Sequence, residues 1–186
     1  MSIYTRQGDD GRADRGGERT AKSDPFFEAI GTVDELNAQI GLCRAAVEPL
    51  GPESPIGTAL GAAQGELLTV GALLAVGAGM VSGERDAEAR LEAAAEGIEQ
   101  RIDDGEERLR AMTSFVLPGG CEASARLHVA RTVCRRAERR VVAARQAGAA
   151  VPEPVLRYLN RLGDLLFTLA REANAAAGAA EQEWRA

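Results

Sequence analysis

Residues 154–177 read PVLRYLNRLGDLLFTLAREANAAA, and this stretch decides the fold class. Its apolar side chains recur at steps of three or four: Val155, Leu159, Leu162, Leu166, Leu169 and Ala173. That spacing places them on one face of an α-helix, with polar residues on the other faces. The stretch begins with a proline, which suits the first turn of a helix. We predict an amphipathic helix from about Pro154 to Ala177.

The same period marks four earlier segments, so the whole chain is helical in pattern. Asp24-Pro25 is a good helix start, and Pro118-Gly119-Gly120 cannot lie inside a helix. No segment alternates convincingly as a strand does. The expected helices are about 25–47, 58–79, 86–112 and 122–147, with a frayed tail after Ala177. Five helices with short connections predict an all-α, single-domain, ferritin-like antiparallel up-and-down bundle over residues 23–177.

Composition narrows the function classes. A chain of 186 residues fits one domain, and 45% hydrophobic with 27% charged residues is a globular balance. A net charge of −6 argues against nucleic acid as a partner. Residues 1–21 show no secretory signal, and the most apolar stretch, Leu67 to Met80, is shorter than the roughly 20 residues of a membrane span. Three cysteines without a CxxC pair indicate reduced thiols, and we predict a cytoplasmic protein with no membrane partner.

A charged stripe on the fourth expected helix is the first candidate site. His128, Arg131, Arg135 and Glu138 follow one another at steps of three, four and three. Two arginines one turn apart can converge on a phosphate chain, because a guanidinium matches phosphate geometry. The alternative is a solvated basic face. His128 has no second histidine beside which to bind a metal, so we interpret it as structural.

Two weaker candidates lie near the ends of the chain. The segment from Thr5 to Gly17 is rich in glycine, which lets backbone N–H groups turn around an anion. A flexible polar tail is the alternative. On the fifth helix Asn160 and Asp164 stand one turn apart, where they form either a site or an exposed polar face.

Taken together, five separated motifs resemble the PduO-type ATP:cob(I)alamin adenosyltransferases. They are Tyr4-Thr5-x-x-Gly8-Asp9-x-Gly11 with Gly17-Glu18-Arg19, Lys22 and Asp24-Pro25; Gly31-Thr32-Val33-Asp34-Glu35-Leu36-Asn37 with Ile40-Gly41; Phe115-x-Leu117-Pro118-Gly119-Gly120; Leu127-His128-x-Ala130-Arg131-x-x-x-Arg135-Arg136-Ala137-Glu138-Arg139; and Leu159-Asn160-Arg161-Leu162-x-Asp164-x-Leu166-Phe167, with Ala170-Arg171 and Asn174 beyond. The motifs span most of the chain, in order.

The resemblance implies an enzyme and a site. The enzyme would be a homotrimer with active sites between subunits, moving the 5′-deoxyadenosyl group of ATP to cob(I)alamin and releasing triphosphate. Residues 1–22 would bind ATP, with Mg²⁺ held mainly by the triphosphate and no side-chain ligand assigned. The ATP residues would be Tyr4, Thr5, Arg6, Gln7, Gly8, Asp9, Gly11, Lys22, Arg131, Arg135, Arg136, Glu138 and Asn160. Those on the cobalamin side would be Phe115, Asp164 and Phe167.

The resemblance also implies individual roles. Arg131 would pair with Asp34 and fix the interface, while Arg135 would lie nearer the triphosphate. Phe115 would press beneath the corrin and exclude a lower axial ligand. Cobalt(I) is a strong nucleophile that needs no protein base, so catalysis would be positioning and charge stabilisation. A corrinoid reductase and an adenosylcobalamin-dependent mutase are the partners that such an enzyme implies.

Three positions depart from the family pattern. Gln7 and Ala13 lack hydroxyls, and Asp10 places a negative charge where the family has a lysine. These departures favour one alternative, a divergent non-catalytic member that binds nucleotide or adenosylcobalamin as a carrier or sensor. A plain helical interaction protein is the other alternative, but it leaves the arginine stripe unexplained.

Overall fold

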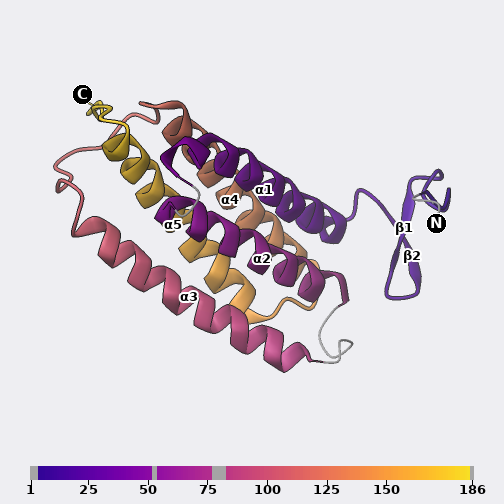
Figure 1. Ribbon diagram of the computed structural model, residues 1–186. Helices are drawn as coiled ribbons and strands as arrows, with labels where there is room; N and C mark the ends of the chain where they lie inside the picture. The colour runs from indigo at the N-terminus through magenta and orange to yellow at the C-terminus, as the bar shows by residue number, and fades with distance from the viewer. Residues whose placement is uncertain (1–3, 52–53, 77–82, 185–186) are drawn as a thin grey trace.

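Five long helices and one small hairpin make up the protein, in a computed structural model that describes residues 4–51, 54–76 and 83–184 (Figure 1). The elements are β1 (Arg12–Arg15), β2 (Glu18–Ala21), α1 (Pro25–Val47), the short 3-10 turn η1 (Glu48–Leu50), α2 (Pro55–Val76), α3 (Glu84–Glu106), α4 (Glu122–Gln146) and α5 (Glu153–Ala176). The prediction of five helices is confirmed. The expected end of the second helix at Gly79 lies outside the described residues.

The helices pack in the order α2, α1, α4, α5, α3. α1 and α4 run antiparallel, as two ion pairs between them show: Glu35 pairs with Arg136 at 2.6 Å and Glu28 with Arg140 at 3.4 Å. α3 and α5 run parallel, with ion pairs from Glu99 to Arg161 and from Glu106 to Arg171. α3 and α4 are consecutive in the chain but do not pack side by side, so the connection between them crosses one end of the bundle.

The apolar seam of α5 forms the centre of the core. Its members Val155, Leu159, Leu162, Leu166 and Leu169 are fully buried. Apolar residues that recur at the same steps of three and four in α1, α2 and α4 are buried as well, among them Leu36, Leu67 and Leu127. Their burial confirms the helical period as the determinant of this fold. Asp24 begins α1 by accepting a hydrogen bond from the Phe26 N–H at 2.8 Å.

The prediction that the chain contains no strands was wrong. β1 and β2 form an antiparallel hairpin in which Arg12 faces Ala21 and Arg15 faces Glu18. The turn between them uses Gly16 and Gly17, both with positive φ, which glycine adopts without strain. Each strand is only four residues long and none of its side chains is fully buried, so no apolar alternation marks it in the sequence. The fold is therefore mostly helical rather than all-α.

The third helix also ends earlier than predicted. α3 stops at Glu106 instead of Met112, and the N–H groups of Arg108 and Leu109 close tight turns onto Gly105 and Glu106. The carbonyl of Arg110 accepts a hydrogen bond from Arg171 at 2.6 Å, which draws the chain away from the helix axis. The connection from 107 to 121 is accordingly long, although short connections were expected.

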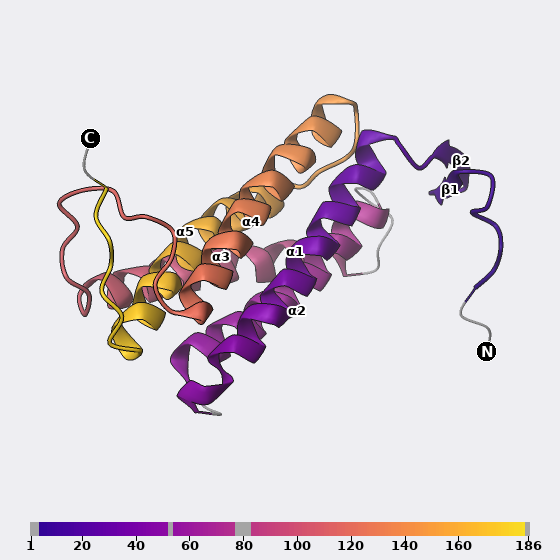
Figure 2. The same ribbon diagram turned by 90° about the horizontal axis from the view of Figure 1, so that it is seen from above.

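The carboxyl-terminal tail is ordered by pairing, which contradicts the expectation of fraying. Val116 and Glu183 form an antiparallel bridge, the Leu117 N–H donates to Gln182 O at 2.8 Å, and the Trp184 N–H donates to Phe115 O at 2.7 Å. Figure 2 shows the tail running beside the 107–121 connection, at the end of the bundle opposite the hairpin. Backbone pairing of this kind leaves little trace in a sequence.

One described helix segment, Pro55–Ala75, has the length and apolar composition of a membrane span, with a mean hydropathy of 1.3. The apolar stretch is thus longer than the sequence reading of Leu67 to Met80. A core helix of a soluble protein satisfies the same criteria. Here Leu60, Leu67 and Val70 are buried in the bundle, so one side of α2 belongs to the core.

Candidate active site

Arg135 is the centre of the polar cluster on α4. Its Nη1 donates to the Glu138 carboxylate at 3.1 Å and its Nη2 to Asp164 of α5 at 3.2 Å. Glu138 in turn accepts a hydrogen bond from the Asn160 side chain at 2.9 Å, and Asn160 accepts one from Arg161. Arg135, Glu138, Asn160 and Asp164 therefore form one network, which joins the candidate stripe on α4 to the separate candidate pair on α5.

Arg131 lies one turn from Arg135 and has a donor to spare. Its Nε is buried and has no acceptor among the described residues. An unpaired buried donor costs about 1–3 kcal/mol, more when the group is charged. The position is therefore suited to an anionic ligand.

His128 lies on the same helix one turn before Arg131. It is 4% exposed and packs edge-on against Phe167, with ring centroids 5.9 Å apart. Burial lowers the pKa of His128, and the neighbouring Arg131 charge lowers it further. Burial thus favours the neutral form of the ring, which packs on Phe167 in agreement with the structural interpretation of His128.

A cleft of about 280 Å³ opens beside the two arginines. It is lined by Ile102, Glu106, Met112, Arg131, Arg135, Gly163, Asp164, Phe167 and Thr168. A methyl group on Gly163 would lie 3.3 Å from Arg135 Nε, so this glycine leaves the room that the guanidinium occupies. Sequence reasoning missed Gly163, although a glycine inside a strongly periodic helix was the signal that could have found it.

The amino-terminal hairpin is held by its own polar contacts. Arg19 bonds Asp10 at 2.7 Å and the Gln7 carbonyl at 2.6 Å, while Lys22 Nζ donates to Gly8 O at 2.9 Å. Hydrogen bonds from the Arg12 backbone N–H and from the Arg19 guanidinium lower the pKa of Asp10. The acidic substitution at position 10 is therefore neutralised within the hairpin itself.

Phe115 sits on the 107–121 connection and is 79% exposed. An aromatic ring this exposed contributes little to folding. The cross-strand pairing places Phe115 opposite Trp184, which is also exposed, and Leu117 stands two residues along on the same side. The loop thus presents apolar side chains to the outside.

Several predicted site residues do not meet within one chain. Figures 1 and 2 both show the amino-terminal segment with its hairpin projecting beyond one end of the bundle, while the 107–121 connection that carries Phe115 lies at the other end. The predicted ATP residues from Thr5 to Lys22 belong to this amino-terminal segment. Asp34 is exposed on α1 and makes no ion pair with any described residue, Arg131 included. Arg136 pairs with Glu35 instead of facing the cleft.

No metal site is formed by side chains of the described residues. Among them there is no group of three or more His, Cys, Asp or Glu that could hold a metal ion. Cys43, Cys121 and Cys134 are unpaired thiols, as predicted. Burial raises the pKa of Cys43 to about 11 and that of Cys134 to about 12, which makes both thiols poor nucleophiles.

A helical bundle in which two arginines line a cleft defines a class of protein suited to binding a phosphorylated substrate. The exposed Phe115 offers a further apolar contact outside this cleft. The chain belongs to the cobalamin adenosyltransferase family, whose model matches residues 3–173. The resemblance found in the sequence is thereby confirmed.

Individual relatives agree with this assignment. The corrinoid adenosyltransferase of Bacillus subtilis is 39% identical over 184 residues, covering 99% of this chain and 92% of that protein. The human corrinoid adenosyltransferase MMAB is 42% identical over 176 residues, covering 92% of this chain and 68% of that protein. A variant PduO-type ATP:corrinoid adenosyltransferase from Lactobacillus reuteri, solved with cobalamin and ATP, superposes with a TM-score of 0.85 at 30% identity over the whole of both chains.

Proposed function

We propose that this protein transfers the 5′-deoxyadenosyl group of ATP to cob(I)alamin, giving adenosylcobalamin and triphosphate. Family membership over residues 3–173 is the observation that carries the proposal. The relatives are named corrinoid adenosyltransferases, and the L. reuteri enzyme was solved with both substrates bound. The arginine cleft and the exposed Phe115 give this chain the two kinds of surface that these substrates need.

The reaction asks for charge stabilisation more than for proton transfer. A cobalt–carbon bond forms at the 5′ carbon of ATP as the bond from that carbon to the triphosphate oxygen breaks. Both electrons of the broken bond leave with triphosphate, so negative charge grows at the leaving group. Arg131 and Arg135 supply positive charge there, and the unpaired Nε of Arg131 is a donor ready for a phosphate oxygen. Mg²⁺ would be held by the triphosphate oxygens, where it supplies further neutralisation.

Phe115 would act on the other substrate. An exposed ring on a loop fixed at both ends can press against the lower face of a corrin and displace an axial ligand. Cobalt(II) without its lower ligand is easier to reduce to cobalt(I). Asp164 and Phe167 line the same cleft as Arg131 and Arg135, with Phe167 packed against His128, and they would contribute to the cobalamin side of the site.

We further propose that each active site is built by two subunits of a homotrimer. The hairpin and the Phe115 connection lie at opposite ends of α1, a helix of 23 residues and thus roughly 35 Å long. One chain would therefore not bring the hairpin to ATP and Phe115 to the cobalamin that reacts with that ATP. α1 carries Leu42 and α4 carries Val129, each 50% exposed, and Asp34 is exposed on α1. Asp34 would then meet Arg131 of a neighbouring subunit.

Subunit complementation tests this composite site. Lys22→Met should inactivate the hairpin, and Arg135→Met should inactivate the cleft. In trimers reassembled from equal amounts of both, about a quarter of the sites would receive an intact hairpin and an intact cleft. Recovery of activity on mixing supports the composite site, whereas mixtures as inactive as the two parents would place hairpin and cleft function in one chain.

The reaction itself is tested by its products. Under anaerobic conditions with chemically reduced cobalamin, ATP and Mg²⁺, adenosylcobalamin and triphosphate should appear in equal amounts. Formation of diphosphate or phosphate in place of triphosphate would contradict the proposed transfer. A reducing partner enzyme, a mutase that receives the product and a cytoplasmic location remain predictions.

A further inference from the structure

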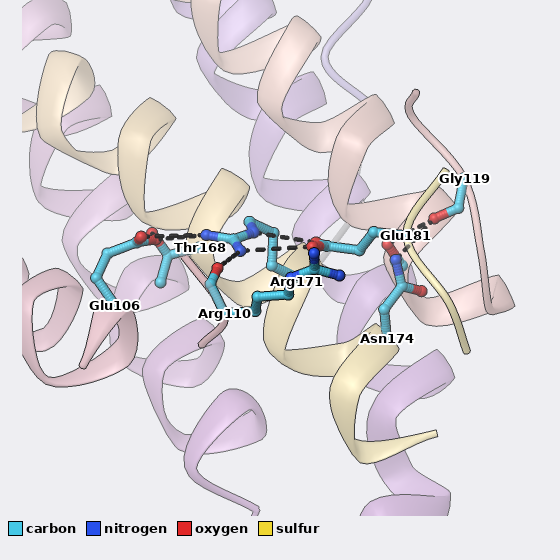
Figure 3. Close-up of polar contacts among 8 residues, drawn as sticks. Glu106, Arg110, Gly119, Thr168, Arg171, Asn174 and Glu181 are labelled. Carbon is cyan, nitrogen blue, oxygen red and sulfur yellow. Dashed lines mark hydrogen bonds and ion pairs between the residues drawn. The ribbon is translucent and has the colours of Figure 1, made fainter. Parts of the chain in front are cut away.

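Two polar side chains of α5, one turn apart, hold the two ends of the connection that carries Phe115. Arg171 is 1% exposed and Asn174 is 3% exposed, so both are buried. Figure 3 shows the Arg171 guanidinium lying between Glu106 and Glu181, with Asn174 directed toward Gly119. Neither side chain lines the arginine cleft on α4.

Each of the five N–H groups of Arg171 can reach an acceptor. Its Nε donates to Glu181 at 3.0 Å, Nη1 to both Glu106 oxygens at 3.1 and 3.2 Å, and Nη2 to Arg110 O at 2.6 Å and to Glu181 at 3.4 Å. These acceptors belong to three segments: the end of α3, the start of the 107–121 connection, and the tail. A lysine has three donors on a single nitrogen and cannot reproduce this fork.

Asn174 holds the other end of the connection. Its side chain accepts from the Cys121 N–H at 2.9 Å and donates to Gly119 O at 3.1 Å. Gly120 between them has φ +100, and a Cβ there would lie 2.1 Å from the Asn174 Oδ1. The backbone at this end has therefore one tight arrangement.

Phe115 lies midway and is placed by its backbone alone. Its carbonyl accepts from the Trp184 N–H, and the tail that supplies this N–H is itself tied to Arg171 through Glu181. Because the ring is 79% exposed, side-chain packing contributes little to its position. The polar clamp on α5 thus decides where the ring stands.

We infer that Arg171 is a positioning residue for Phe115, acting through Arg110 on the connection and through Glu181 on the tail. This inference rests on the proposed role of Phe115 beneath the corrin. When the clamp is loosened, the connection has more than one arrangement and the ring excludes the lower axial ligand less often. Glu106, one partner of Arg171, also lines the arginine cleft, but Arg171 and Asn174 do not. A lysine at position 171 keeps the positive charge beside Glu106, so we expect ATP binding at the cleft to change little.

The conservative variant Arg171→Lys separates positioning from bulk stability. With cob(II)alamin and ATP bound, electron paramagnetic resonance reports the fraction of cobalt that is four-coordinate. We expect Arg171→Lys to lower the ratio of four- to five-coordinate cobalt by about fivefold or more, while the Kd for ATP changes by less than about twofold. The control is Arg90→Lys, which alters an α2–α3 ion pair, with Glu66, that includes no residue of the connection. It should leave both quantities unchanged.

Hydrogen exchange reads the same effect without cobalamin. The Leu117 N–H, which donates to Gln182 O, should exchange faster in Arg171→Lys than in Arg90→Lys. Glu181→Gln is the milder variant, since its residue lies in the tail outside the helical core, and it should change exchange in the same direction. Unchanged exchange and unchanged coordination in Arg171→Lys and Glu181→Gln overturn the inference. Wild-type protein that forms no adenosylcobalamin, while Arg171→Lys still deprotects Leu117, would count against the proposed function instead.

Discussion

Replacing Arg135 by methionine removes one positive charge and keeps most of the side-chain stem. At about 4 Å and an effective dielectric constant near 20, one charge pair is worth roughly 4 kcal/mol. The Arg135 side chain is 38% exposed, so screening reduces this to about 2–3 kcal/mol. Glu138 and Asp164 would lose their cation and repel the triphosphate, which works in the same direction. We expect kcat/KM to fall about 100-fold.

The assay is anaerobic adenosylcobalamin formation at several ATP concentrations. Because charge on triphosphate grows as the bond breaks, most of the loss should appear in kcat. Stability should change little, since part-exposed ion pairs contribute about 0–1 kcal/mol each. Arg139→Met is the matched control, on the same helix but exposed and away from the cleft. A loss below about threefold in Arg135→Met, or an equal loss in Arg139→Met, would refute the reasoning.

Three further predictions follow from the site. Phe115→Ala should make cob(II)alamin harder to reduce, which would be seen as loss of the four-coordinate cobalt(II) signal while the affinity for ATP is kept. An equal loss of that signal and of ATP affinity would contradict the role assigned to Phe115. Gly163→Ala places a methyl group 3.3 Å from Arg135 Nε and should lower kcat/KM several-fold. The control Gly97→Ala, whose Cβ meets open space, should leave kcat/KM unchanged. Neither variant should destabilise the protein, because alanine favours a helix over glycine by about 1 kcal/mol. The pKa of His128 is lowered in the folded chain, so as the pH falls the unfolded chain takes up the His128 proton before the folded chain does, near pH 6.5. Between pH 7 and pH 5 the Tm of the wild-type protein should therefore fall more than that of His128→Asn. Equal falls in Tm for the two proteins would show that His128 is not the cause.

The helices were predictable because burial follows a period that the sequence displays. The seam from Val155 to Ala173 needs no partner to be recognised, and every member of it is buried. The hairpin was not predictable in this way, because its short strands rest on backbone pairing and on the turn at Gly16-Gly17. The early end of α3 was hidden for a different reason: it depends on Arg171, 61 residues away from Arg110 in the chain.

The residues of the candidate site likewise fall into those that the sequence pattern predicts and those that it does not. Residues on adjacent turns of α4 could be grouped from spacing, since Arg135 does reach Glu138. Spacing left Asp164 of α5 in a separate candidate, which only the family resemblance joined to the arginines, and Arg135 does contact it. Spacing could not tell that the hairpin and the 107–121 connection, which carries Phe115, lie at opposite ends of the bundle. It also gave no role to Arg171 or Asn174, whose partners lie on segments without any period.

The most direct test of the account is the number of turnovers that each protein chain performs. Wild-type protein at low concentration, with excess ATP, Mg²⁺ and continuously reduced cobalamin, is followed by the visible spectrum of adenosylcobalamin. We predict many equivalents of product per chain, and none without protein. Product that stops at one equivalent per chain or less, with ATP still bound, would contradict catalysis and identify a carrier or sensor.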